Sequence, residues 1–169
     1  MKNSLRFSLM VGLLAVMTSF GLAQQSKQHV LSGDELQSIV PAEYFFHGQK
    51  AATQLRNSGG LRLADGKTVL AALVDTAGYS SAIQQKYQGM LITEIPLLIE
   101  GSELRPGQYG FGFTAEGEFV VMDVASSDML SVTSKTDVAL ARPVPLKVVE
   151  ADGGYRLYAG RNWVALKVK

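Results

Sequence analysis

The chain has 169 residues, of which 47% are hydrophobic and 18% charged, and this length suits a single domain with a buried core. It contains no cysteine, which excludes disulfides, thiol catalysis, cysteine metal sites and a lipid-modified N-terminal cysteine. The formal net charge is only +1. Nucleic acids and anionic membranes need a concentrated basic surface, so the charge argues against both as partners.

The first 23 residues have the composition of a secretory signal peptide. Lys2 and Arg6 make a positive start, and Leu9–Phe20 is an apolar run of 12 residues. Gly21-Leu22-Ala23 then places small residues at the two positions that a signal peptidase reads. A membrane span needs about 20 residues, so an uncleaved anchor is the weaker alternative. We expect cleavage after Ala23 and export to the periplasm or the medium.

Residues 24–169 are then expected to form one β-rich domain without a membrane span, carrying 14 basic and 15 acidic residues. Near its start, Ser32 and Glu35 have the spacing of a capping box. Leu36, Ile39 and Val40 follow as an apolar face, and Pro41 ends the pattern. This predicts one helix of about two turns, which serves as a lid on the core rather than as a partner-binding helix.

Short strands are predicted over the next part of the chain. Residues 51–63 suggest two strands joined by a turn at Asn57–Gly60. Thr68–Asp75 is almost continuously apolar, which is typical of a strand covered on both faces. Thr76–Gly89 has no clear period and is interpreted as either a loop or one helical turn.

The segment Leu91–Val124 has the clearest strand and turn signals. Its apolar residues alternate from Leu91 to Ile99, and Pro96 places that strand at a sheet edge or at a bulge. Glu100-Gly101 predicts a turn, and Arg105-Pro106-Gly107-Gln108 predicts a type II turn with positive φ at the glycine.

Residues 109–124 continue this segment as a predicted hairpin. Tyr109, Phe111 and Phe113 share one strand face, whereas Gly110 and Gly112 leave the opposite face open to the close approach of backbone, a bulky side chain or a ligand. Ala115-Glu116-Gly117 then predicts the tight hairpin turn into the strand at 119–124.

The C-terminal part completes an all-β pattern. Strands are predicted near Leu130–Thr133 and Asp137–Leu140, and residues 144–168 form a three-stranded meander with turns at Asp152–Gly154 and Gly160–Asn162. About nine short strands with regular turns are typical of an antiparallel β-sandwich or a barrel-like fold. The fold class is therefore all-β, with one short N-terminal helix.

Two motifs resemble known sites but lack the context that those sites need. Gly78-Tyr79-Ser80-Ser81-Ala82 is similar to a nucleophile elbow, in which the catalytic histidine follows the serine. The only histidines, His29 and His47, precede Ser80. Gly110-x-Gly112-x-x-Ala115 matches a dinucleotide fingerprint formally, but it continues a strand into a hairpin instead of opening a helix. No cofactor is expected.

Charged and metal-binding groups give no stronger signal. His29 and His47 are isolated in the sequence, so no metal site is expected. Glu94, Glu100 and Glu103 could form a carboxylate pair of the glycosidase type, but they fit a solvated face better. No catalytic residue is therefore assigned.

The remaining candidates are polar and aromatic residues in two segments. They are Tyr44, His47, Tyr79, Ser80, Lys86 and Tyr87. Tyrosines suit a small-ligand or glycan pocket because they have an apolar body and a hydroxyl tip. The competing interpretation is a set of aromatic plugs that seal one end of the β-structure, and it is the stronger of the two.

Residues Gly101–Asp123 (GSELRPGQYGFGFTAEGEFVVMD) resemble a hairpin in a family of exported bacterial domains of unknown function, with the pattern G-x-x-L-P-A-G-x-Y-x-L-F. Leu104, Pro106, Gly107, Tyr109 and Phe111 match, whereas an arginine precedes the proline and no residue separates the proline from the glycine. The resemblance implies an exported β-sandwich and no catalytic residues. The only tryptophan is Trp163, near the end, which does not fit the early G-x-W of lipocalins.

The sequence favours a non-catalytic binding or envelope-associated module. Its partner would be a small molecule, a glycan or an envelope protein. One alternative is a small secreted hydrolase that uses Ser80 or a carboxylate. Another is a structural module that pairs through the predicted edge strand at Pro96.

Overall fold

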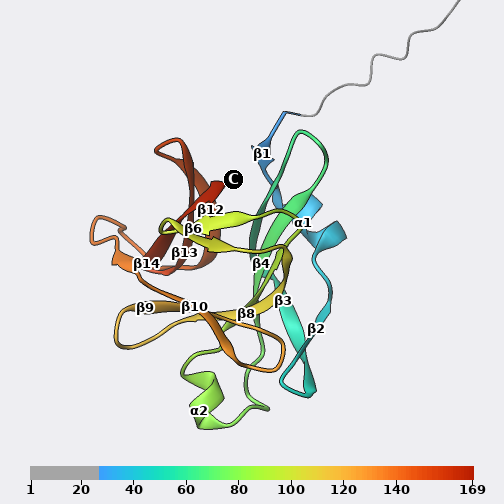
Figure 1. Cartoon of the computed structure of the whole chain (residues 1–169), viewed down its shortest axis with the longest axis vertical. Coiled ribbons are helices and arrows are strands. Elements are labelled where there is room, and N and C mark those ends of the chain that lie inside the picture. Colours follow the sequence, from blue (N-terminus) through green and yellow to red (C-terminus); the bar gives the residue numbers. More distant parts are fainter. Residues whose placement is uncertain (1–26) are drawn as a thin grey trace, which may run out of the picture.

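The computed structural model describes residues 27–169 and folds them into two antiparallel β-sheets with two short helices (Figure 1). This confirms the all-β prediction, with the sheets packed as a sandwich. The predicted signal peptide and its cleavage site after Ala23 lie outside the described residues. Among those residues, none of the helices is long and apolar enough to cross a membrane.

The larger sheet has eight strands and the smaller has six. The larger sheet has the spatial order β1 (His29–Val30), β3 (Gln49–Arg62), β4 (Thr68–Val74), β5 (Gly89–Thr93), β8 (Gly107–Phe113), β9 (Glu118–Met122) and β10 (Asp128–Thr133), and β2 (Glu43–Phe46) pairs with β3. The smaller sheet has the order β12 (Val144–Ala151), β13 (Gly154–Gly160), β14 (Asn162–Val168), β6 (Leu97–Ile99) and β7 (Ser102–Leu104), and β11 (Lys135–Thr136) pairs with β14.

The main core lies between the sheets. Tyr109, Phe111 and Phe113 on β8 point toward the smaller sheet, as their alternation predicted. Phe119 packs against the last two of these rings, with centroids 5.5 Å from Phe111 and 4.8 Å from Phe113. Leu157 and Val164 of the C-terminal meander bury fully against this layer. The inner faces of both sheets therefore supply one continuous apolar interior.

A second core covers the other face of the larger sheet. It contains Leu36 from helix α1 (Gly33–Ile39), Phe46 from β2, and Tyr87, which follows helix α2 (Ser81–Gln84). β4 contributes to both cores, because Ala71 faces the smaller sheet and Ala72 faces the second core. The prediction that this strand is covered on both faces is confirmed.

The glycine face of β8 is where this second core approaches most closely. A Cβ added at Gly110 would overlap the Phe46 ring, and one at Gly112 would overlap the carbonyl oxygen of Lys86. The predicted close approach to this face is therefore met by an aromatic side chain and by backbone.

Helix α1 begins with the predicted capping box. The Ser32 hydroxyl accepts from the Glu35 N–H at 3.4 Å, and the Glu35 carboxylate accepts from the Ser32 N–H at 2.9 Å. The backbone hydrogen bond from Ser32, helped by His29 and the Ser32 hydroxyl, lowers the pKa of Glu35 to about 2. Leu36 then anchors the helix in the second core as a lid.

Residues 51–63 differ from the prediction of two strands and a turn. All but Leu63 belong to one long strand, β3, whose register to β4 shifts between Thr53 and Ser58. The glycines that suggested a turn serve a close packing contact instead. A Cβ at Gly59 would lie 2.7 Å from the backbone nitrogen of Val148, so glycine lets β12 approach β3.

The prediction of a single strand from Leu91 to Ile99 is also wrong, although the alternate apolar residues of this segment are buried as predicted. β5 ends at Thr93 and β6 begins at Leu97, and the chain crosses from the larger to the smaller sheet between them. The Thr93 hydroxyl stabilises this crossing by donating to the Ile95 carbonyl at 2.6 Å. β6 lies between β14 and β7, so the segment at Pro96 is not a sheet edge.

Two further predictions are corrected. Gly107 has no positive φ and opens β8, so the type II turn is absent. Glu100 and Gly101, in the β6–β7 turn, do have positive φ. A valine at Gly107 would still destabilise the fold, because its Cβ would lie 2.9 Å from the Tyr109 hydroxyl oxygen. Residues 137–140 form a turn instead of a strand, in which Asp137 accepts from the Ala139 N–H at 3.0 Å.

Replacing Gly112 by alanine tests the close contact on β8. The added methyl group would overlap the Lys86 carbonyl, so we expect a loss of about 1–3 kcal/mol in the free energy of unfolding. Gly33→Ala is the matched control, because nothing lies within 4 Å of its Cβ position and its φ is not positive. Equal denaturation midpoints for the two variants would contradict the contact.

Candidate functional site

The three candidate tyrosines lie in the second core. Tyr44, Tyr79 and Tyr87 are 4%, 5% and 0% exposed. Tyr87 stacks on Phe46 with centroids 3.9 Å apart, and Tyr79 meets both rings edge-on at 5.2 and 6.2 Å. In this structure the tyrosines seal the core beneath the 76–88 segment and do not line an open pocket.

The tyrosine hydroxyl groups differ in their hydrogen bonding. The Tyr79 hydroxyl donates to the Phe46 carbonyl at 3.1 Å. Those of Tyr44 and Tyr87 have no hydrogen-bond partner in the described part of the chain. Burial raises the pKa of both Tyr44 and Tyr87, and for Tyr87 the neighbouring tyrosines raise it further. These side chains therefore remain neutral.

The other three candidates are exposed and do not join the tyrosines. His47 occupies the β2–β3 turn, where it and Gly48 both have positive φ, as a two-residue hairpin of type I′ requires. Ser80 is the N-cap of α2, but its side chain makes no capping hydrogen bond and has no base within reach among the described residues. Lys86 forms an ion pair with Asp128 at 2.7 Å.

His47 does contact a serine that the sequence analysis did not select. Its Nδ1 lies 3.0 Å from the Ser126 hydroxyl and 3.3 Å from the Ala125 carbonyl. A nucleophile would also need donors for an oxyanion. The N–H groups of Ala125 and Ser127 donate to the Asp123 carboxylate, and that of Ser126 donates to the Asp123 carbonyl. The contact between His47 and Ser126 therefore stabilises the turn between β9 and β10. The backbone N–H groups beside it are already hydrogen-bonded, so they cannot stabilise an oxyanion.

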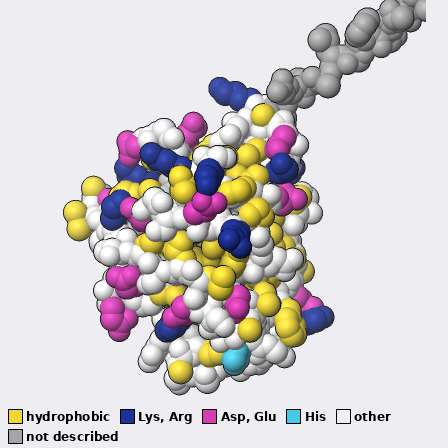
Figure 2. Space-filling model, viewed as in Figure 1, with side chains coloured by type: hydrophobic (Ala, Val, Ile, Leu, Met, Phe, Trp, Pro, Cys, Tyr) yellow, Lys and Arg dark blue, Asp and Glu magenta, His cyan; other side chains and the backbone are white. Residues whose placement is uncertain are grey.

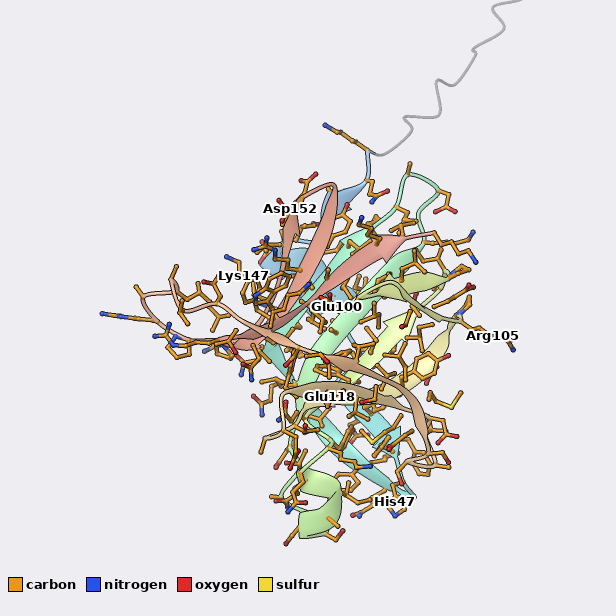
Figure 3. The ribbon with its side chains drawn as sticks, turned by 60° about the vertical axis from the view of Figure 1, so that its left-hand side comes forward. His47, Glu100, Arg105, Glu118, Lys147 and Asp152 are labelled. Carbon is orange, nitrogen blue, oxygen red and sulfur yellow. The ribbon has the colours of Figure 1, made fainter. Side chains whose placement is uncertain are left out.

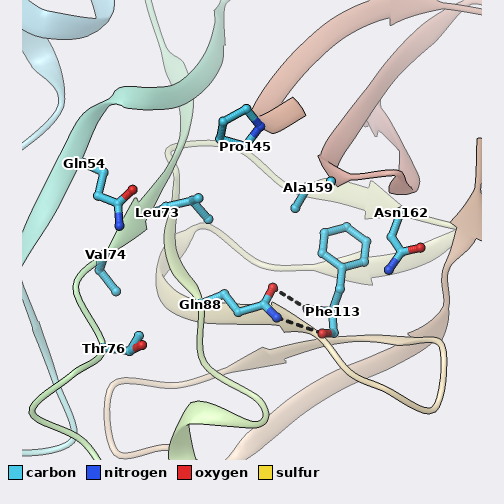
Figure 4. Close-up of a pocket in the computed structure, with 10 residues that line it drawn as sticks. Gln54, Leu73, Val74, Thr76, Gln88, Phe113, Pro145, Ala159 and Asn162 are labelled. Atoms are coloured by element: carbon cyan, nitrogen blue, oxygen red, sulfur yellow. Dashed lines mark hydrogen bonds between the residues drawn. The ribbon is translucent and has the colours of Figure 1, made fainter. Parts of the chain in front are cut away.

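A groove opens instead beside the 76–88 segment, where the ends of β4 and β8 meet the β13–β14 turn (Figure 4). It consists of two adjoining hollows of about 330 and 760 Å³, which share Gln88, Phe113 and Asn162. The other lining residues are Gln54, Leu73, Val74, Thr76, Pro145, Ala159 and Gly160 in the first hollow and Gln84, Gln85, Lys86, Thr114, Ala115 and Glu116 in the second.

Side-chain amides are the characteristic groups of this groove, and two of them are fixed by the backbone. Gln88 donates to the Phe113 carbonyl at 2.9 Å and accepts from the Phe113 N–H at 3.0 Å, so it extends the β-ladder by one side chain (Figure 4). Gln84 donates to the carbonyls of Thr76 and Tyr79, each at 2.9 Å. These bonds hold the 76–88 segment at the edge of the groove.

The remaining amides keep hydrogen-bonding capacity for a ligand. Gln54 accepts from Asn57 at 2.6 Å, and Asn162 accepts from Thr136 at 3.1 Å. These bonds occupy the oxygen of each amide, so its NH₂ group can donate to a ligand. Gln85 is exposed, and no described residue forms a hydrogen bond with its side chain. Of the sequence candidates, only Lys86 reaches this groove.

The sequence signal for the groove was the glutamine spacing within the segment already chosen. Gln84, Gln85 and Gln88 lie between Tyr79 and Gly89, whereas the candidates predicted in this segment were Tyr79, Ser80, Lys86 and Tyr87. Asn162 carried no signal, because its position depends on a turn in the other sheet. Within residues 27–169, no group of three or more histidine, aspartate or glutamate side chains could hold a metal ion.

Comparisons with known proteins supply no further evidence on the site. No protein-family model matches the chain, and searches of curated proteins and of solved structures found no match.

Removing the Tyr87 hydroxyl tests its unpaired state. We expect Tyr87→Phe to leave the stability unchanged or to raise it by up to about 1 kcal/mol, since an unsatisfied buried hydroxyl is costly. Tyr79→Phe is the matched control, because it removes a hydrogen bond to Phe46 and should lower the stability by about 1 kcal/mol. Urea denaturation measures both, and a greater loss for Tyr87→Phe would refute the assignment.

The raised tyrosine pKa values also predict a dependence of stability on pH. The folded protein retains protons that unfolded tyrosines release near pH 10, so this stabilisation is complete below about pH 10 and is lost as the pH rises further. The double variant Tyr44→Phe/Tyr87→Phe should lose less stability than the wild type between about pH 9 and 11. Chemical denaturation gives the stability of both proteins at each pH. Parallel curves of stability against pH for the wild type and the double variant would show that the two hydroxyls ionise equally in the folded and unfolded states, and would contradict the prediction.

Proposed function

We propose that the protein is an exported, non-catalytic binding domain whose ligand is a neutral, hydroxyl- and amide-rich molecule such as a segment of glycan. The observation that carries this proposal is the continuous groove lined by the amides of Gln54, Gln84, Gln85, Gln88 and Asn162. Its export rests on the signal-like composition of residues 1–23.

The chemistry of the groove supports a neutral polar ligand. A side-chain amide donates and accepts hydrogen bonds, as do the hydroxyl and N-acetyl groups of sugars. The charged residues at the rim are Lys86 and Glu116, which have opposite signs, and Lys86 is already paired with Asp128. Phe113 and Pro145 add apolar wall area that a sugar C–H face can contact.

The size of the groove supports an extended ligand. The smaller hollow alone reaches the lower end of the roughly 300–1,000 Å³ that is typical of small-molecule sites. The second hollow continues from it past the shared residues Gln88 and Asn162. A chain of two or three sugar units therefore fits the arrangement better than a single small molecule.

The two other functions suggested by the sequence gain no support from the geometry. A hydrolase centred on Ser80 would need a base, and Ser80 has none within reach among the described residues. A carboxylate hydrolase would need two free acids, but Glu94 accepts from Thr68 and Glu100 and Glu103 are paired with Lys135 and Lys169. A structural module that pairs through Pro96 would need an open edge there, but the adjoining strand β6 is paired on both sides.

Titration with a trimer of N-acetylglucosamine tests the proposal, because the probe is neutral and rich in hydroxyl and amide groups. Isothermal calorimetry should show saturable binding, and ¹⁵N spectra should show shifts for the side-chain amides of Gln85 and Asn162. Shifts confined to residues outside the groove, or no binding at millimolar probe, would overturn it.

A variant pair makes this test specific to the groove. Gln85→Ala removes an exposed amide that no local hydrogen bond fixes, so folding should be unaffected. Loss of one ligand hydrogen bond should weaken binding roughly three- to tenfold. Gln37→Ala on the exposed face of α1 is the matched control and should bind like the wild type. Equal affinities for all three proteins would exclude Gln85 from the site.

A further inference from the structure

A third hollow lies on the outer face of the smaller sheet. It has a volume of about 240 Å³ and includes Asp152 at the tip of the β12–β13 hairpin, far from His47 (Figure 3). Its functional side chains come from β11, β13 and β14: Lys135, Arg156, Trp163 and Lys167. None of these residues lines the amide groove.

Strand alternation explains why these side chains share one face. Val164 and Leu166 of β14 point into the core, so Trp163, Ala165 and Lys167 point outward. Lys135 on β11 and Tyr158 on β13 are the register partners of Trp163 from its two sides. The topology thus places the only tryptophan of the chain between two neighbouring strands that both present polar groups.

Two cationic side chains lie over the Trp163 ring. The Lys135 ammonium lies 4.8 Å from the Trp163 ring centroid, and the Arg156 guanidinium carbon lies 4.2 Å from it. Both distances are within the range of favourable cation–π interactions. The Tyr158 ring packs beside the indole with centroids 6.1 Å apart.

Hydrogen bonds fix the orientation of Arg156. One guanidinium NH₂ group donates to the Asp152 carboxylate, and the other donates to the Tyr158 hydroxyl at 3.4 Å. The Tyr158 hydroxyl in turn donates to Asp137 at 3.1 Å. These contacts raise the pKa of Arg156 and keep its remaining N–H donors in one place. A planar guanidinium held in this way is suited to an oxyanion.

The charge balance of the hollow indicates what kind of anion fits. Lys135 is paired with Glu100 at 2.6 Å, and Arg156 is paired with the exposed Asp152. Lys167 forms no ion pair with a described residue, so the cations that line the hollow keep one positive charge beyond those paired with Glu100 and Asp152. Asp137, which accepts from the Tyr158 hydroxyl, adds one negative charge to the same network. The group is therefore close to neutral overall, and a singly charged carboxylate fits it better than a phosphate, which carries about two charges.

The walls of the hollow add an apolar surface next to the cations. Ala151, Gly154 and Ala165 line it together with Trp163. The volume is below the roughly 300–1,000 Å³ of sites for drug-sized ligands, which limits the occupant to a single small unit.

We propose that this hollow is a second binding site, which takes a small monocarboxylate. The carboxylate binds between Arg156 and Lys167, and the body of the ligand lies against Ala165 and the indole of Trp163. Two sources of such a ligand share this chemistry: a sugar acid and the C-terminal carboxylate of a peptide.

The tryptophan reports directly on the site, because it is the only one in the chain. Trp163 fluorescence should change saturably with D-glucuronate, with N-acetylalanine, or with both, and should not respond to D-glucose, which lacks the carboxylate. A response to glucuronate alone identifies a sugar acid, and one to N-acetylalanine alone identifies a peptide terminus. No response to either acid, or an equal response to glucose, would overturn the proposal.

Lysine variants separate this site from general charge effects. Lys167→Gln removes an exposed cation that forms no ion pair with a described residue, and should raise the dissociation constant roughly fivefold. Lys67→Gln also removes one charge, but from the β3–β4 turn, and should leave the affinity unchanged. Equal affinity for the Lys167→Gln variant and the wild type would refute the role of Lys167.

The two proposed sites can fail independently. Gln85→Ala lies in the amide groove and should leave the Trp163 response to the acids unchanged. A negative result with the N-acetylglucosamine trimer would likewise have no bearing on the response to glucuronate. Loss of the Trp163 response in the Gln85→Ala variant would contradict a separate site.

Discussion

The packing of Phe46 and the Lys86–Tyr87 backbone onto the glycine face of β8 is the contact on which the rest of the structure depends. Without Cβ atoms at Gly110 and Gly112, the β2–β3 hairpin and the 76–88 segment can lie directly on the larger sheet. Phe46 and Tyr87 then stack on each other and close the second core. The central strands β4, β5, β8 and β9 of the larger sheet are thereby buried on both faces, so they can be almost wholly apolar.

This contact also determines where polar groups can be used. The docked 76–88 segment brings its glutamines to the place where the larger sheet meets the β13–β14 turn, and the amide groove forms there. The outer face of the smaller sheet is not covered in this way, so its cations and Trp163 meet solvent. Charges of both signs are interspersed over the face seen in Figure 2, whereas each proposed site has a distinct chemistry of its own.

The sequence predicted the features that depend on local chemistry. The capping box at Ser32, the alternation of Tyr109, Phe111 and Phe113, and the hairpin turns at Gly117 and Gly153 are all present. Predictions failed where a remote segment decides the outcome. Gly59 signals a turn locally but accommodates β12 from far along the chain. Likewise, the sequence left the tyrosines open between a ligand pocket and the favoured aromatic plugs, because their burial depends on the remote glycine face of β8. Asn162 gave no signal before the sheets were assembled.

The crossing at Pro96 has a consequence for the order in which the chain can fold. β5 and β8 are neighbours in the larger sheet, yet the chain between them leaves to build the β6–β7 hairpin of the smaller sheet. The main partner of that hairpin is β14, where Leu97 pairs with Val168 at the far end of the chain. During synthesis the larger sheet can assemble first, while β6 keeps an unpaired edge until the last strand is available. Such long-range pairing slows folding, and it makes the C-terminal strand the element that closes the sandwich.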